Sequence, residues 1–365
     1  MTYAWRPATR SIFRALTTPS LPLQPRVDLI HRARTRLQLR AFHAQYNPQL
    51  EDQTATLSDG RKIGFAEYGD SSGTPAFFFH GAPGSRYDGL GYDAPARKLG
   101  VRIICPDRPG HGLSSPFPGR TLSSYARDIS ELAARLKLGP YHVFGQSGGG
   151  PYAVACAYAS PKDELLNATV VAGMGHPDQI TVREAGWYTV LALGLHARFP
   201  GAMTRFMDWW YPPSFFANDE KVRRALRRMY KLLRAEDRAL MEEPKAEPAI
   251  VACLRAAFAQ GSAGTLGDSL IYYGPWDFEL RDVKRRVQLI FGDKDNRTPL
   301  VFGKYYEEHL RDAELWELKD CSHFTIAKYL DEIMARVVGV EVPKKEKGEA
   351  SVGDKGASEP GKTEV

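Results

Sequence analysis

The 365-residue sequence has few cysteines and no cysteine pattern that would build a metal site or a disulfide framework. Cys105, Cys156, Cys253 and Cys321 are far apart, and no CxxC pair occurs among them. This spacing argues against a zinc ribbon or a disulfide-stapled domain and favours a reducing compartment. We therefore expect neither a metal ion nor another cofactor.

Long apolar runs and a secretory signal are also missing. The longest apolar candidate lies around residues 188–195, well short of the ~18 residues that a membrane span needs. Near the N-terminus, Arg14 and several prolines interrupt any apolar segment of a signal peptide. The sequence thus predicts no transmembrane segment and no secretory leader.

Acidic residues are almost absent from residues 1–50. This segment holds eight arginines, no lysine and one acid, Asp28, so it carries a charge of +7. Because the whole chain carries +6, the other 315 residues carry −1. A basic body that would attract nucleic acid is therefore excluded, and no nucleic-acid partner is expected.

The composition of residues 1–50 is typical of an organelle transit peptide. Serine and threonine accompany the arginines, and the apolar residues 12, 13 and 16 have helical spacing. Residues 40–43, Arg-Ala-Phe-His, resemble mitochondrial processing sites with arginine three residues before the cut. We expect a mitochondrial protein. The alternative is a cytoplasmic protein with a poorly ordered basic extension or a mispredicted first exon.

Short apolar runs rich in β-formers alternate with helical patterns along the body of the chain. Residues 53–57 and 62–68 flank Ser58-Asp59-Gly60, which predicts a hairpin. Further strands are predicted at residues 76–79, 101–105, 141–144, 168–172, 287–291 and 314–317. These runs are mostly apolar throughout, which is typical of a parallel sheet covered on both faces by helices such as residues 121–136. The predicted fold class is α/β, with a doubly wound, mostly parallel sheet.

One long interval breaks the alternation, and it predicts an inserted helical cap. Residues 175–278 have a helical pattern rich in aromatic residues, so the core would comprise residues 51–174 and 279–342. A cap there would cover the ligand crevice at the carboxyl ends of the strands, and its aromatic residues favour an apolar pocket. His196 of the cap either packs or touches substrate. Residues 343–365 predict a disordered tail, because they lack aromatic residues and mix charges.

A basic run within the cap, residues 221–234, predicts an amphipathic helix with a cationic face. Such a face is usually solvated. The alternative is peripheral docking onto an anionic membrane surface.

The segment of residues 141–150, YHVFGQSGGG, carries the clearest chemical signal. An apolar strand runs into Gly145-x-Ser147-x-Gly149 and then into a helix of small residues over residues 151–160. Glycines allow the tight turn of a nucleophile elbow, which lifts the serine hydroxyl clear of the sheet. The pattern predicts Ser147 as a nucleophile.

An elbow serine needs a base, and the base needs an acid that orients it. Asp293 and Asp295 follow the strand predicted at residues 287–291, and His323 follows the last strand. Both segments are loops at strand ends, so their side chains are expected to converge on Ser147. The order serine, aspartate, histidine is the one expected for an elbow on such a sheet.

Together these motifs resemble the α/β-hydrolase superfamily over residues 52–340. Residues 80–85, HGAPGS, are similar to the family's HGxPG loop, and residues 107–114, DRPGHGLS, to its DxPGxGxS loop. The resemblance implies Ser147 as nucleophile, His323 as general base and then acid, and Asp295 as the orienting carboxylate.

The same resemblance decides two further points. The family pattern Gly-x-x-Asp selects Asp295 over Asp293. The backbone N–H groups of Ala82 and Gly148 would form the oxyanion hole.

A serine at the elbow separates this chain from relatives that use aspartate there, the epoxide hydrolases and haloalkane dehalogenases. We therefore expect an acyl-enzyme route that cleaves a carboxylic ester, lactone or thioester of a small to medium apolar molecule. One alternative is an aminopeptidase resembling proline iminopeptidases, in which Glu242, Glu243 or Glu247 would hold a free amino group. The other is a non-catalytic binding module on the same fold.

Overall fold

The computed structural model describes residues 48–179, 187–210, 213–243 and 246–340. Most of the predicted basic leader, up to residue 47, and the predicted tail at residues 343–365 lie outside these described residues. All four cysteines are buried and free.

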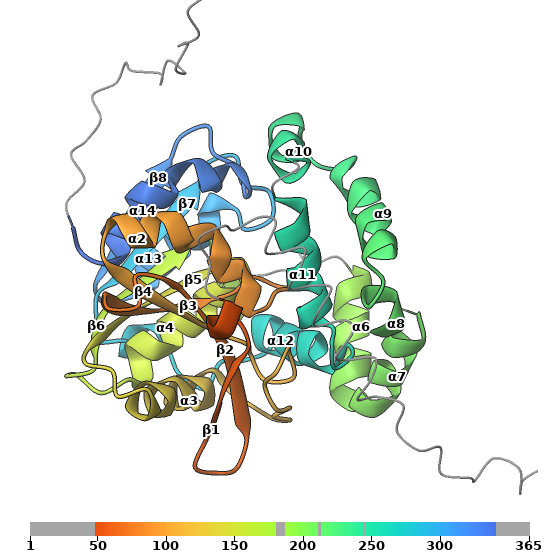
Figure 1. Ribbon diagram of the computed structural model, residues 1–365, viewed down its shortest axis with the longest axis horizontal. Helices are drawn as coiled ribbons and strands as arrows, with labels where there is room; N and C mark the ends of the chain where they lie inside the picture. The colour runs from red at the N-terminus through yellow and green to blue at the C-terminus, as the bar shows by residue number, and fades with distance from the viewer. Residues whose placement is uncertain (1–47, 180–186, 211–212, 244–245, 341–365) are drawn as a thin grey trace, which may run out of the picture.

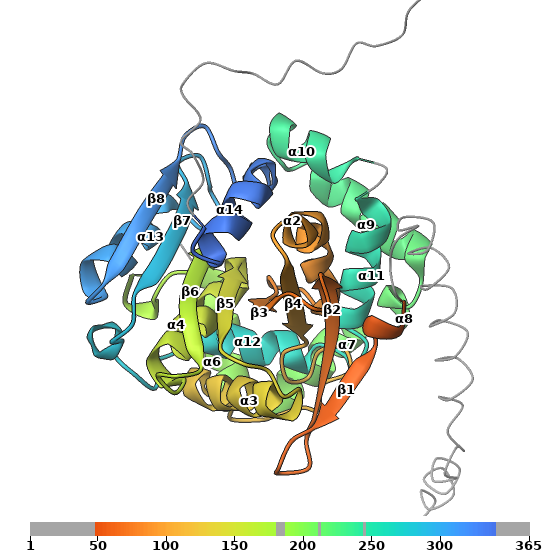
Figure 2. The ribbon, with the colours of Figure 1, turned by 60° about the vertical axis from the view of Figure 1, so that its left-hand side comes forward.

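Eight strands form one sheet, and each lies where the sequence predicts a strand. They are β1 (Gln53–Thr56), β2 (Lys62–Gly69), β3 (Thr74–Phe79), β4 (Val101–Pro106), β5 (Tyr141–Gln146), β6 (Leu165–Val171), β7 (Val287–Gly292) and β8 (Ala313–Leu318). The spatial order is β1-β2-β4-β3-β5-β6-β7-β8 (Figure 2). Strands β1, β2 and β4 pair antiparallel, and all other neighbours pair parallel. Parallel pairing brings the carboxyl ends of β3, β4, β5, β6, β7 and β8 to one edge of the sheet.

Helices cover both faces of the sheet, as the apolar strands predict. On one face lie α3 (Leu122–Arg135), α4 (Gly150–Ala159) and α13 (Leu300–His309), which share one buried cluster with the strands. On the other face lie α2 (Asp93–Lys98) and α14 (Leu330–Val337), which belong to a second cluster. The doubly wound α/β fold is therefore confirmed.

Sequence patterns explain two of these helices. Helix α3 begins at a capping box. The backbone N–H of Ser124 donates to Thr121 Oγ1, and the backbone N–H of Thr121 donates to Ser124 Oγ. It buries a stripe at residues 122, 125, 126, 129, 132 and 133, the spacing of one helix face. Helix α4 consists of small and apolar residues and is buried over residues 150–157, because it lies between the sheet and α3.

Between β6 and β7 the chain leaves the sheet and forms a layer of helices beside it. These are α6 (Trp187–Arg198), α7 (Pro200–Trp210), α8 (Pro213–Phe216), α9 (Asp219–Tyr230), α10 (Ala235–Met241), α11 (Glu247–Ala257) and α12 (Ala263–Tyr273). Helices α11 and α12 lie closest to the strands, and α6, α7, α8 and α9 lie farther out (Figure 1). Short 3-10 turns occur at Pro48–Leu50, Arg86–Tyr92, Ser147–Gly149, Pro177–Gln179, Leu280–Asp282 and Thr325–Tyr329.

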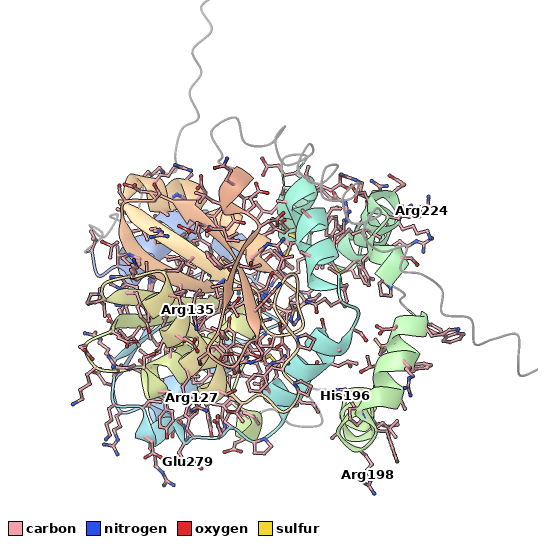
Figure 3. All side chains as sticks on the ribbon, turned by 60° about the horizontal axis from the view of Figure 1, so that its bottom comes forward. Arg127, Arg135, His196, Arg198, Arg224 and Glu279 are labelled. Atoms are coloured by element: carbon pink, nitrogen blue, oxygen red, sulfur yellow. The ribbon has the colours of Figure 1, made fainter. Side chains whose placement is uncertain are left out.

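Helix α9 is amphipathic, as its basic run predicts. Val222, Leu226 and Tyr230 are buried on one face, where they pack with Leu233 and Val251 of α11. Arg224 lies on the opposite, solvent-facing side of the cap (Figure 3).

No helix in the described part of the chain is long and apolar enough to cross a membrane. Over the same residues, no three His, Cys, Asp or Glu side chains are grouped as metal ligands would be.

His142 on β5 makes the stability of the fold depend on pH. Burial lowers the pKa of His142 to about 4, whereas an unfolded histidine has a pKa of about 6.5. The unfolded chain therefore binds a proton first, and the stability present above pH 6.5 is lost as the pH falls towards 4. Between pH 6.5 and 5 this loss is about 1.5 kcal/mol.

We expect His142→Leu to remove that part of the pH dependence. Urea unfolding of the wild type and the variant at pH 6.5 and 5 measures it. Equal losses of stability in the two proteins would contradict the assignment.

Candidate active site

Ser147 stands at a sharp turn between β5 and α4. Its backbone φ is 53°, a left-handed conformation that is uncommon for a residue with a side chain. The flanking glycines are needed because a Cβ at Gly145 would lie 2.1 Å from Gly149 O, and a Cβ at Gly149 would lie 2.0 Å from Phe79 O. The turn thus packs against the end of β3, and Ser147 lies beside Gly81.

His323 and Asp295 meet in a buried hydrogen bond. His323 Nδ1 lies 2.7 Å from Asp295 Oδ2, and the two residues come from the loops after β8 and β7. Because an ionised carboxylate only accepts, Nδ1 carries the proton and donates it. The ring's other nitrogen, Nε2, is then free to act as a base.

The turn that follows Asp295 keeps its carboxylate charged. The backbone N–H groups of Arg297 and Thr298 donate to Asp295 Oδ1 at 2.8 and 2.9 Å, and Thr298 Oγ1 lies 2.9 Å from Oδ2. Burial raises the pKa of Asp295, but the His323 bond and these amides outweigh burial and hold the pKa below its usual range. Thr298 was not predicted to contribute, although its position three residues after an aspartate is typical of a side-chain turn.

Asp293, the competing acid, has a different partner. Its Oδ1 accepts from the backbone N–H of Cys321 at 3.3 Å, so it connects the acid loop to the histidine loop. Of the two aspartates, Asp295 is the one that the structure brings to His323.

The residues after β6 connect the serine turn to the acid turn. Met174 N donates to Ser147 O at 2.8 Å, and Thr298 Oγ1 lies 2.8 Å from Ala172 O. The hydrogen bonds of the described residues include none from the Ser147 hydroxyl to His323. In ligand-free enzymes, catalytic hydrogen bonds are often long or misaligned, and they tighten when the substrate binds.

Ala82 and Gly148 are neighbours across the site. A Cβ at Gly148 would lie 2.8 Å from Ala82 Cβ, so the two backbones run side by side next to Ser147. Asp88 helps to position the Ala82 loop, because its Oδ2 accepts from Gly81 N at 3.1 Å and its Oδ1 accepts from Cys253 Sγ at 2.8 Å. Burial raises the pKa of Asp88. No sequence motif pointed to this aspartate.

A buried ion cluster joins the same loop to the cap. Asp268 of α12 accepts from Arg108 Nε at 2.8 Å, from Arg120 Nη2 at 2.6 Å and from Tyr152 Oη at 2.8 Å. Arg108 also donates to the backbone oxygens of residues 80 and 81. Burial raises the pKa of Asp268, but the two guanidinium groups reverse the effect and keep the pKa far below its usual range. Sequence analysis did not identify Asp268.

An apolar cavity of about 560 Å³ lies between the cap and the core, but it does not reach the serine. Residues 109, 110 and 116–122 and helices α6, α7 and α12 line it, with His196 on the core side of α6 (Figure 3). At 100° per residue, Gly267 and Leu270 lie on a different face of α12 from Asp268 and Tyr272. An apolar pocket beneath the cap is thus present, but Ser147, Asp295 and His323 are not among the residues that line it.

Four aromatic residues of the cap face solvent. Phe199, Phe206, Trp209 and Trp210 are each more than half exposed. These four residues belong to the surface of the cap, whereas Trp276 of the same region lines the cavity.

Comparison with known proteins identifies the family. A model of the alpha/beta hydrolase family matches residues 76–336. The chain belongs to this family. The nucleophile turn, the His323–Asp295 pair and the sheet order are thus found together on a family member.

The curated relatives match only in part. A non-heme chloroperoxidase of Streptomyces lividans is 37% identical over 110 residues, 30% of this chain and 40% of that protein. A bifunctional esterase/perhydrolase of Acinetobacter calcoaceticus is 32% identical over 124 residues, 33% of this chain and 44% of that protein. The chain thus spans less than half the length of these relatives.

Solved structures extend the likeness of fold. An esterase from Exiguobacterium antarcticum superposes with a TM-score of 0.56, covering 79% of this chain and 98% of the esterase. At 17% sequence identity, this likeness concerns the fold alone.

The ion cluster generates a stability prediction. Asp268→Asn leaves two buried guanidinium groups without a carboxylate, so it should lower the free energy of unfolding by about 3–5 kcal/mol. The matched control is Asp331→Asn, which breaks an exposed ion pair with Lys98 and should cost about 0.5 kcal/mol or less. Urea unfolding measures both. Equal effects would show that Asp268 does not hold the cap to the core.

Proposed function

We propose that the protein is a serine hydrolase that cleaves a carboxylic ester, lactone or thioester of a small to medium apolar molecule. The observation that carries the proposal is the 2.7 Å bond between His323 Nδ1 and Asp295 Oδ2, at the sheet edge where Ser147 follows β5. Membership of the alpha/beta hydrolase family and an esterase/perhydrolase relative support it.

The proposed reaction proceeds through an acyl-enzyme. His323 Nε2 takes the proton of Ser147 Oγ as the oxygen attacks the substrate carbonyl carbon. The resulting oxyanion accepts from the backbone N–H groups of Ala82 and Gly148. His323 then gives its proton to the leaving alcohol, and the acyl group stays on Ser147. Water, deprotonated by His323, attacks the acyl carbon. The bond from that carbon to Ser147 Oγ then breaks, Oγ takes the proton back from His323, and the acid leaves.

Asp295 has two effects in this cycle. It fixes the tautomer that leaves Nε2 unprotonated, and its charge stabilises the imidazolium that forms when His323 takes the proton. Both effects depend on the carboxylate staying ionised, which the lowered pKa of Asp295 favours.

The aminopeptidase alternative is supported less well. Glu247 is ion-paired with Arg223 and lies 3.5 Å from a nitrogen of Arg227, so its charge is already neutralised. Glu242 and Glu243 are exposed at the end of α10. A non-catalytic binding role would give the chain no evident use for a buried aspartate–histidine pair behind an elbow serine.

The first experiment is labelling with a fluorophosphonate probe, followed by assays with ester, lactone and aminoacyl-arylamide substrates. Ser147→Ala should abolish labelling and lower turnover by roughly 10⁴-fold or more. Labelling that persists in Ser147→Ala, or a folded wild type that does not react, would contradict the proposal. Arylamide turnover that exceeds ester turnover would favour the aminopeptidase.

A matched pair tests the acid. Asp295→Asn should lower kcat roughly 10³- to 10⁴-fold, because the histidine loses its orienting charge. Asp293→Asn, two residues away in the same loop, should lower kcat less than about tenfold, since its partner is a backbone N–H. Equal losses in both variants would contradict the assignment of Asp295.

Peripheral membrane contact is a separate part of the proposal. The surface proposed for it lies on α6 and α7 and is not the cationic face of residues 221–234 considered from the sequence. The proposed patch consists of exposed apolar side chains on α6, on α7 and between them: Leu191, Leu195, Phe199, Phe206, Trp209 and Trp210. Exposed Arg198 and Arg205 stand on the same two helices. Tryptophan and phenylalanine beside arginine are suited to an anionic lipid surface, because rings enter the headgroup region while guanidinium groups pair with phosphates.

Vesicle flotation tests this contact. The full chain should float with vesicles that contain anionic lipid, and Trp209→Ala/Trp210→Ala should weaken binding at least about tenfold. The control is Leu232→Ala, which removes an exposed apolar side chain outside the patch. Unchanged vesicle binding of the double variant would exclude the patch as the lipid-binding surface. If the wild type dimerises with increasing concentration and the double variant does not, the partner of the patch is a second copy of the chain.

Mitochondrial import stays a prediction from residues 1–50.

A further inference from the structure

Tyr272 has a buried hydroxyl with no hydrogen-bond partner. The residue lies near the end of α12 and is 5% exposed, and its Oη makes no hydrogen bond to any described residue. Leaving a buried hydroxyl unpaired costs about 1–3 kcal/mol, so such a group calls for an explanation. Its position supplies one.

The hydroxyl lies beside Gly148 and Ala82. A Cβ at Gly148 would lie 2.5 Å from Tyr272 Oη and 2.8 Å from Ala82 Cβ. The phenol therefore reaches the place where these two backbones meet, next to Ser147. The hydroxyl thus stands beside the two residues whose backbone N–H groups are proposed to hold the oxyanion.

The ion cluster fixes this position from both sides. Asp268 precedes Tyr272 by one helical turn, so both lie on the same face of α12. Asp268 is bound to Arg108 and Arg120, and Arg108 also holds the backbone oxygens of residues 80 and 81. The cap helix that carries the phenol and the loop that carries Ala82 are thus attached to the same guanidinium group.

The phenol keeps its proton at neutral pH. Burial raises the pKa of Tyr272 well above its ordinary value, and the nearby Arg108 charge only partly opposes this. A neutral phenol donates a hydrogen bond, whereas a tyrosinate would repel an oxyanion.

We propose that Tyr272 Oη is a third donor of the oxyanion hole. It donates to the carbonyl oxygen of the substrate as that oxygen becomes negative, and the proton stays on Tyr272 throughout. The inference rests on the serine-hydrolase function proposed above. It gives the cap a part in catalysis, because the donor comes from α12 and not from the sheet.

The test compares Tyr272→Phe with Tyr230→Phe. Tyr230, on α9, also has a buried and unpartnered hydroxyl, but it packs among apolar cap residues. For an aryl ester, Tyr272→Phe should lower kcat roughly 10- to 100-fold and leave KM unchanged, since the bond strengthens only in the transition state. Tyr230→Phe should leave both constants unchanged.

A second readout separates oxyanion binding from a structural role. A trifluoromethyl ketone forms a tetrahedral adduct with serine, so its inhibition constant should rise by the same factor as kcat/KM falls. A raised KM, a lowered melting temperature, or unchanged ketone affinity would overturn the proposal. If Tyr272→Phe does not fold, Gly148→Ala/Ala82→Gly replaces it. Both N–H groups stay, the loss of the Ala82 methyl makes room, and the new methyl, 2.5 Å from Tyr272 Oη, displaces the hydroxyl.

Failure of this inference is distinguishable from failure of the proposed function. A wild type that hydrolyses esters through Ser147, together with a fully active Tyr272→Phe, would overturn only the third donor. A folded wild type that neither reacts with fluorophosphonate nor hydrolyses esters would overturn both.

Discussion

Ser147 holds its left-handed backbone only because glycines stand two residues before and after it. Side chains at Gly145 or Gly149 would collide with backbone oxygens about 2 Å away. This turn presses the start of α4 against the end of β3 and sets Gly148 beside Ala82. The loops after β6, β7 and β8 then only have to reach the same edge, which parallel pairing ensures. The position of the candidate site therefore follows from one backbone constraint.

A second interaction decides how the cap meets that edge. Arg108, Arg120 and Asp268 are buried together, so none of them is favourable without the others. Through Arg108 the cluster holds the loop of Ala82, and through Asp268 it holds α12. Catalytic geometry and cap position are thus coupled, and a change in the cap can reach the oxyanion side of the site without touching Ser147.

Most of the fold and the site could be predicted because their signals are local. Apolar runs of four to eight residues mark the strands, and Gly145-x-Ser147-x-Gly149 marks the turn. Asp268 and Tyr272 could not be predicted, because their partners lie more than a hundred residues away and no spacing encodes such a pairing. Composition also could not tell which cap aromatics are exposed, because it indicates neither which face of a helix is covered nor which cavity it lines.

An acyl group on Ser147 is the central claim, and pre-steady-state kinetics tests it most directly. Mixed with excess nitrophenyl ester, the full chain should release one equivalent of nitrophenol in a burst before steady turnover. Mass spectrometry of the acid-quenched protein should then find the acyl group on the peptide that contains Ser147. Hydrolysis without a burst and without an adduct would leave acyl-enzyme formation unsupported, and an adduct on any other residue would contradict the account.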